Sequence, residues 1–161
     1  MKWLLVAVFA LNLSCHSAGA NGPYARFVRV EHLAPGGRAP VTSGLTLSTR
    51  TVVVDQAAFE SLWRQAFSGS ASTAPMPSVD FTQKKVVFVA LGERSSSGHE
   101  IRVKGARRIA DELVIEVEIV RPGDCPAAAV MTQPMDVVAI PRTEPHVIVR
   151  FIETTRVGEC P

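Results

Sequence analysis

Three consecutive serines and a histidine lie close together in the stretch GERSSSGHEIRV. A serine acts as a nucleophile when a histidine takes its proton and a carboxylate orients that histidine. The residue types that this chemistry would need are present as Ser96, His99, His146, Asp136 and Glu144. A nucleophile elbow, however, places G-x-S-x-G on a turn from a strand into a helix, and here an alternating strand follows. The pattern therefore favours a loop over a serine active site.

The serines fall where the chain must reverse between two predicted strands, residues 84–92 and 99–104. Gly92 and Gly98 bracket this reversal and can supply a positive φ, so we expect a hairpin loop. Serine hydroxyls can hold such a loop in shape by bonding to nearby backbone. A second turn follows at RPGDCP. The candidate partner-binding residues in the two loops are Arg94, Ser95, Ser96, Ser97, Gly98, His99, Gly123 and Asp124.

Cysteine usage suggests a second kind of chemistry. Apart from Cys15, the chain has only Cys125 and Cys160, in the similar contexts DCP and ECP. Two surviving cysteines in an oxidising compartment usually pair, so we expect a disulfide between them. The alternative is a thiolate metal site that includes His99 or His146, but no CxxC or HxxxH spacing supports a metal centre. The sequence indicates no cofactor.

The N-terminus predicts export. Lys2 precedes the apolar run WLLVAVFAL, which is too short to span a bilayer, and small residues follow. Residues 1–20 therefore resemble a signal peptide, which leaves residues 21–161 as one domain. The AGA at 18–20 fits a cleavage site before Asn21, whereas Ser14 before Cys15 suggests a lipidated cysteine. The mature chain is thus periplasmic or extracellular, or it is anchored to a bacterial membrane by lipid.

The balance of charge argues against nucleic acid as a partner. The chain has 17 basic and 15 acidic side chains, and removal of the signal peptide takes away one lysine. The basic pairs at 84–85 and 107–108 are isolated. A nearly neutral domain lacks the basic surface that binds phosphate backbones.

One helix and several strands must position these residues. Asp55 is a good N-cap for residues 56–67, where apolar residues recur at helical spacing. The predicted stripe is Phe59, Leu62, Trp63, Ala66 and Phe67. Strands are predicted at 25–33, 84–92, 99–104, 113–120, 135–141 and 146–153, and residues 43–55 are expected to form one or two more. We expect a mainly β (α+β) fold, a twisted antiparallel sheet or sandwich of six to eight strands with one amphipathic helix packed on it.

The strand patterns give two finer expectations. The near-continuous apolar run of 84–92 predicts a central strand that is buried on both faces. In 113–120 the alternation places Glu116 and Glu118 on one face and Ile115, Val117 and Ile119 on the other.

The stretch PSVDFTQKKVVFVALGERSSSGHEIRV resembles the core of the PrcB C-terminal domain family. The similarity lies in a Val-Asp-Phe, a hydrophobic strand, a Gly-x-Arg, a turn and an Ile-x-Val strand. It continues through RPGDCPAAAVMTQPMDVVAIP. The matching residues include Val79, Asp80, Phe81, Gly92, Arg94, Ile101, Val103, Pro122, Gly123, Thr132, Pro134, Val137, Val138, Ile140 and Pro141. Ser97 and His99 stand where the family has a glycine and a tyrosine.

The resemblance implies a non-catalytic exported domain that binds or stabilises an extracytoplasmic protein, with an exported protease complex as the suggested partner. The matching residues are turn formers and core aliphatics, and Asp80 is expected to order the loop before the central strand. Two other functions stay open: a peptidase inhibitor that acts through its loops, and a serine hydrolase built on Ser96 with His99 or His146.

Overall fold

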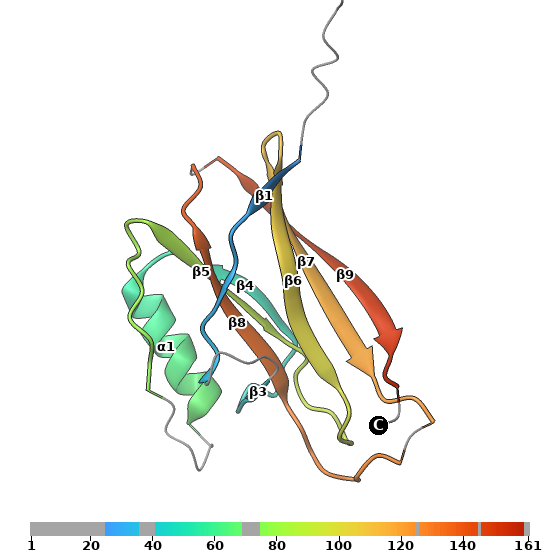
Figure 1. Ribbon diagram of the computed structural model, residues 1–161. Coiled ribbons are helices and arrows are strands. Elements are labelled where there is room, and N and C mark those ends of the chain that lie inside the picture. Colours follow the sequence, from blue (N-terminus) through green and yellow to red (C-terminus); the bar gives the residue numbers. More distant parts are fainter. Residues whose placement is uncertain (1–24, 36–40, 69–74, 125, 145, 160–161) are drawn as a thin grey trace, which may run out of the picture.

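A computed structural model describes residues 25–35, 41–68, 75–124, 126–144 and 146–159. These residues form nine strands and one helix in three layers (Figure 1). Sheet A has the strand order β1 (Arg26–Val28), β6 (Glu100–Ile109), β7 (Glu112–Arg121) and β9 (Ile148–Val157). Sheet B has the order β2 (Glu31–His32), β8 (Pro134–Pro141), β5 (Lys84–Ala90) and β4 (Thr49–Val53), and β3 (Val41–Thr42) also pairs with β8.

The helix α1 (Gln56–Phe67) covers the outer face of sheet B, as the sequence predicts. Asp55 is its N-cap, and the Asp55 carboxylate accepts a hydrogen bond from the Ala58 N–H at 2.9 Å. Phe59 and Trp63 are buried against the sheet, and the Phe59 ring lies 6.0 Å from that of Phe88 on β5. Burying an aromatic side chain of this size stabilises the fold by about 1.5–3 kcal/mol.

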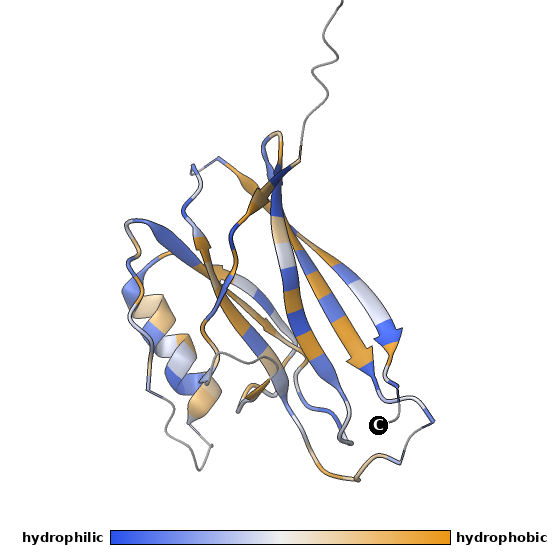
Figure 2. Cartoon of the chain, in the orientation of Figure 1, coloured by the Kyte–Doolittle hydropathy of each residue, from blue (hydrophilic) through white to orange (hydrophobic). Residues whose placement is uncertain are grey.

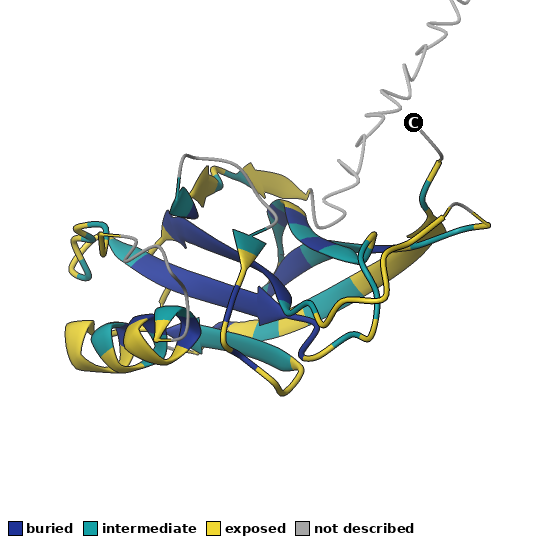
Figure 3. Cartoon of the chain, turned by 90° about the horizontal axis from the view of Figure 1, so that it is seen from below, coloured by how far each residue is buried: buried dark blue, intermediate teal, exposed yellow. Residues whose placement is uncertain are grey.

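Strands β5 and β8 form the middle of the molecule and are buried on both faces, which confirms the prediction for residues 84–92 (Figure 3). Val86 and Phe88 face the helix, whereas Val87 and Val89 face sheet A. The core is therefore two apolar clusters on either side of sheet B. Asp80 orders the loop before β5, as expected: its carboxylate accepts from the N–H of Thr82 at 2.9 Å and from its hydroxyl at 2.6 Å.

The outer face of sheet A is charged, and its strands alternate clearly between apolar and polar residues (Figure 2). Glu116 and Glu118 lie on this face, and Ile115 and Val117 point into the core, as predicted. Glu116 pairs with Arg107 at 3.2 Å. Exposed pairs of this kind add at most about 1 kcal/mol each, so they keep the face soluble more than they stabilise it.

The mainly β (α+β) sandwich with one packed helix is confirmed, and two details of the strand arrangement differ from the prediction. The sequence predicts antiparallel pairing, but β7 and β9 pair in parallel, because β8 crosses to sheet B between them and β9 re-enters sheet A in the direction of β7. The single strand predicted at 25–33 is two short strands in different sheets: β1 pairs with β6, and β2 pairs with β8. The described strands are also one more than the upper limit expected.

In the residues that the structure describes, no helix has the length and apolar character needed to cross a membrane.

Candidate binding site

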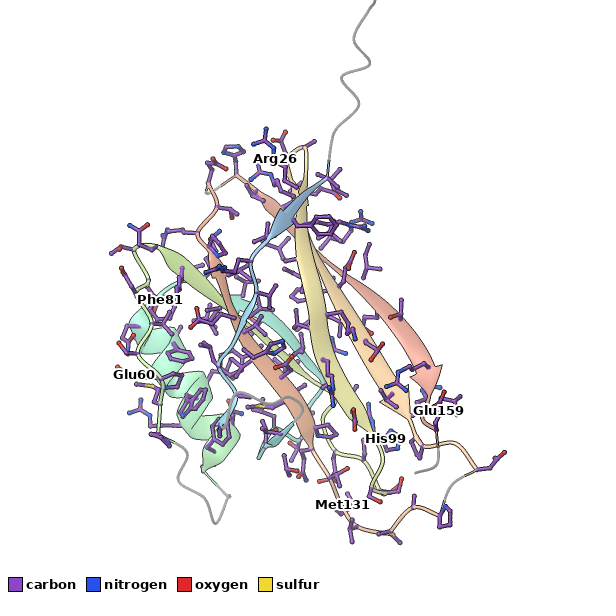
Figure 4. All side chains as sticks on the ribbon, viewed as in Figure 1. Arg26, Glu60, Phe81, His99, Met131 and Glu159 are labelled. Carbon is purple, nitrogen blue, oxygen red and sulfur yellow. The ribbon has the colours of Figure 1, made fainter. Side chains whose placement is uncertain are left out.

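The two loops singled out from the sequence meet at one end of the sandwich, here called the loop end. One is the serine loop, residues 93–99, between β5 and β6. The other is the connection from β7 to β8, which includes residues 122–133. Figure 4 shows His99 of the first loop and Met131 of the second at this end, with Glu159 beyond β9. The fold therefore brings together the two loops that were singled out from the sequence.

Backbone and hydroxyl groups tie the two loops to one another. The Ser97 N–H donates to the Ala128 carbonyl at 2.9 Å, and the Ala128 N–H donates to the Ser97 hydroxyl oxygen at 2.9 Å. The Thr132 hydroxyl donates to the Ser96 carbonyl at 3.0 Å. Arg94 and Thr132 exchange two backbone hydrogen bonds of 2.8 Å. The serine loop is thus a scaffold for the second loop.

The bracketing glycines adopt the expected positive φ, +73° at Gly92 and +85° at Gly98. A Cβ on Gly92 would lie 2.7 Å from the Thr46 carbonyl oxygen, so only glycine fits there. The predicted hairpin, however, does not form. β5 lies in sheet B and β6 in sheet A, so the serine loop arches from one sheet to the other.

Of the residues in the hydrolase hypothesis, Ser96 and His99 share the serine loop, whereas His146 lies elsewhere in the fold. Ser96 lies between β5 and β6 at the loop end, whereas His146 lies between β8 and β9 at the opposite end of the sandwich. The Glu144 carboxylate accepts from Arg108 at 3.1 Å. Among the described contacts, no hydrogen bond joins a hydroxyl of the serine loop to a histidine. The hydrogen bonds described for the serine loop instead join it to residues 128 and 132.

Residues 126–131 are a feature that the sequence reasoning missed. All six residues of this run, PAAAVM, are apolar and exposed. Val130 is 49% exposed and Met131 is 55% exposed. Runs of consecutive exposed apolar residues are rare in soluble domains unless they serve binding. The sequence did contain a signal for this feature: an apolar run without the periodicity of a strand or a helix, between a Pro-Gly turn and β8.

Two pockets open at the loop end. The larger has a volume of about 330 Å³ and is lined by Leu91, Arg94, His99, Ile119 and Arg121. Burial lowers the pKa of His99 below its usual value near 6.5, and the positive charges of Arg94 and Arg121 lower it further. The smaller pocket, about 170 Å³, lies between the serine loop and the end of β9.

The two candidate residues of the second turn have different surroundings. A Cβ on Gly123 would lie 2.8 Å from a Val157 methyl carbon and 3.0 Å from the Gly158 carbonyl oxygen, so this glycine lets the ends of β7 and β9 approach. Asp124 is exposed. Gly123 therefore has a packing role, and Asp124 is exposed at the loop end.

A buried carboxylate inside the sandwich, Asp136, makes contacts with two other strands that the sequence did not predict. Asp136 on β8 is fully buried, and it accepts a hydrogen bond from the Val103 N–H on β6 at 2.8 Å. Its other oxygen lies 3.1 Å from Nδ1 of His32. β1 pairs with residues 106–108, so among the described residues the start of β6 has no strand on that side. Asp136 satisfies the Val103 N–H and joins the two sheets, which is a structural role.

Cys15, Cys125 and Cys160, together with the predicted signal peptide of residues 1–20, lie outside the described residues. Within the part that the structure describes, no group of three or more His, Cys, Asp or Glu side chains could hold a metal ion.

Residues 85–141 match the model of the family described as PrcB C-terminal. The matched segment runs from β5 to β8 and includes both loops of the loop end. No curated protein and no solved structure matches the chain.

Proposed function

We propose that this chain, whose residues 85–141 match the model of the PrcB C-terminal family, is an exported, non-catalytic domain that binds a protein partner through its loop end. The observation that carries this proposal is the exposed apolar run of residues 126–131. The resemblance to the family favours an exported protease complex as the partner.

The loop end has the composition of a protein interface. Exposed apolar side chains, Val130 and Met131 among them, share the loop end with the arginines at 94 and 121. Methionine and arginine are both enriched at interfaces, where an apolar centre is surrounded by a polar rim. The hydrogen bonds that Ser96 and Ser97 accept from Thr132 and Ala128 hold this surface in one shape before binding, which reduces the entropy cost of association.

Site-specific photocrosslinking in the native host tests the proposal. A photoreactive phenylalanine analogue replaces Met131 in one variant and Ile148 in a matched control. Ile148 is also apolar and is 63% exposed, but it begins β9 at the opposite end of the sandwich. We expect one exported protein to be crosslinked at position 131 and not at 148. Equal crosslinking at both positions, or none at 131, would contradict the proposal.

Export itself has a separate test in the intact mass of the chain expressed with its own leader. Cleavage before Asn21, with a mass lighter by two hydrogens than the reduced form, would mean a soluble domain with Cys125 and Cys160 paired. A diacylglyceryl mass beginning at Cys15 would mean a tethered subunit. A chain that retains residues 1–20 would overturn the proposed export.

A loop-based peptidase inhibitor is the second candidate function. It is favoured by the rigidity of the serine loop, which exposes Ser95 while Arg94, Ser96 and Ser97 are fixed by hydrogen bonds. Purified domain added to the crosslinked protease decides between the two functions. An inhibitor blocks cleavage at stoichiometric concentration, whereas an assembly subunit leaves activity intact and slows the thermal inactivation of the protease.

A further inference from the structure

The larger pocket at the loop end is lined by two cationic side chains and no carboxylate. Arg94 and Arg121 stand at its walls together with His99. None of the ion pairs among the described residues includes either arginine. Both guanidiniums act on His99, since each contributes to the lowering of its pKa. Positive charges that converge on one pocket without a counterion favour an anionic ligand.

The rest of the pocket is apolar. Leu91 is buried at the end of β5, and Ile119 is on the face of β7 that points into the core. The volume of about 330 Å³ is at the small end of ligand sites, which span about 300–1,000 Å³. A ligand that fits must therefore carry a negative group and an apolar group within one small unit.

We propose that this pocket binds the C-terminal carboxylate of a peptide segment whose last residue has an apolar side chain. The carboxylate is held by Arg94 and Arg121, and His99 donates one ring N–H to it. The apolar side chain packs on Leu91 and Ile119. This inference rests on the proposed function, because it states which part of a protein partner reaches the loop end.

A chain terminus fits the pocket better than an acidic side chain does. At a C-terminus the carboxylate and the side chain leave the same carbon atom, so one residue can meet both the guanidiniums and the apolar floor. An internal aspartate or glutamate carries only the charge and would leave Leu91 and Ile119 without a partner. The Arg94 guanidinium is also positioned in advance, because it donates a hydrogen bond of 2.8 Å to the Glu93 carbonyl.

Titration of the isotope-labelled chain with three short peptides, followed by amide chemical shifts, tests this inference. The first peptide is acetyl-Ala-Ala-Leu with a free carboxylate, and the second is the same peptide with an amidated C-terminus. The third is acetyl-Ala-Glu-Ala amide, which carries an internal carboxylate only. We expect the free acid to shift the amides of Leu91, His99 and Ile119, and both amidated peptides to bind at least about tenfold more weakly.

Matched variants assign the binding to the two arginines. Arg94→Gln and Arg121→Gln should each weaken the free acid about tenfold. Arg64→Gln, on the exposed side of α1, should leave the affinity unchanged. Thermal melting of each variant confirms that the fold is intact.

Each outcome supports or overturns the inference. Equal binding of acid and amide would exclude a carboxylate site, and tight binding of the glutamate peptide would exclude the chain terminus as its source. Absence of any shift would exclude the pocket. If these titrations fail while Met131 still crosslinks a partner, the proposed function stands without this inference.

Discussion

Ser97 and Ala128 are joined by two hydrogen bonds, one through the backbone N–H of Ser97 and one through its hydroxyl oxygen. The pair is the most direct link between the serine loop and the exposed apolar run. The serine-rich stretch, whose residue types could suggest catalysis, here holds the exposed apolar run in place through hydrogen bonds. The first prediction follows from this link.

Ser97→Ala should loosen residues 126–131 without unfolding the domain. The Ala128 N–H loses its acceptor, and one partly exposed hydrogen bond contributes about 0.5–1 kcal/mol to stability. Hydrogen exchange should become faster at Ala128 and Val130, with little change in β5. Ser95→Ala is the control, since Ser95 is exposed and its hydroxyl makes no hydrogen bond among the described contacts. Unchanged exchange at Ala128 would mean that the hydroxyl does not support the segment.

Asp136→Ala should destabilise the domain by about 3 kcal/mol, because the buried Val103 N–H loses its acceptor and a cavity remains. Asp136→Asn keeps an acceptor oxygen in place and should cost less than half as much. Urea unfolding of both variants measures the difference. Equal losses would show that the bond to Val103 contributes little to holding the sheets together.

Substitution of three glycines by alanine should give a graded series. Gly92→Ala should be worst, because a positive φ costs about 1–2 kcal/mol for a non-glycine residue and the new Cβ meets backbone atoms at 2.7–2.8 Å. Gly98→Ala shares the positive φ but meets Pro122 Cβ at 3.2 Å. Gly105→Ala has neither problem, since its nearest contact is a Glu116 side-chain oxygen at 3.6 Å. The melting temperature should be highest for Gly105→Ala, lower for Gly98→Ala and lowest for Gly92→Ala. Any other order would contradict the loop geometry.

The pH dependence of stability should contain a contribution from His99. Burial first, and then Arg94 and Arg121, lower its pKa in the folded state below the usual 6.5. The unfolded chain then takes up a proton more readily, so stability falls as pH drops through about 6.5 and levels off below the folded pKa. His99→Gln should lose less stability than the wild type between pH 7.5 and 5.5, a range in which carboxylates stay ionised. Identical pH profiles would show that His99 does not titrate as its surroundings indicate.

Most of the fold could be predicted from local sequence patterns. The helical spacing from Phe59 to Phe67, the cap at Asp55 and the alternation around Glu116 each involve residues close in sequence, and each is confirmed. What could not be predicted depends on which sheet a strand joins. The parallel pairing of β9 with β7 follows from the crossing of β8, and the partnership of Asp136 with His32 spans 104 residues.

The candidate site, too, has features that the sequence predicts and features that depend on the tertiary structure. The turn glycines and serines mark both loops in the sequence, but only the fold shows that Ser97 supports Ala128 and that Arg94 and Arg121 line one pocket. The apolar run of residues 126–131 could equally have been a buried strand. Its exposure is a property of the tertiary structure.

Calorimetric titration of the crosslinked partner with three forms of the chain tests whether the loop end is the binding surface. A Val130→Ser/Met131→Ser double variant removes apolar area from the loop end, and Ile148→Ser removes it from the other end of the sandwich. We expect the double variant to bind at least about tenfold more weakly, because interface hot spots cost more than about 1–2 kcal/mol when truncated, and Ile148→Ser to bind like the wild type. Wild-type affinity in the double variant, or an equal loss in Ile148→Ser, would contradict the account.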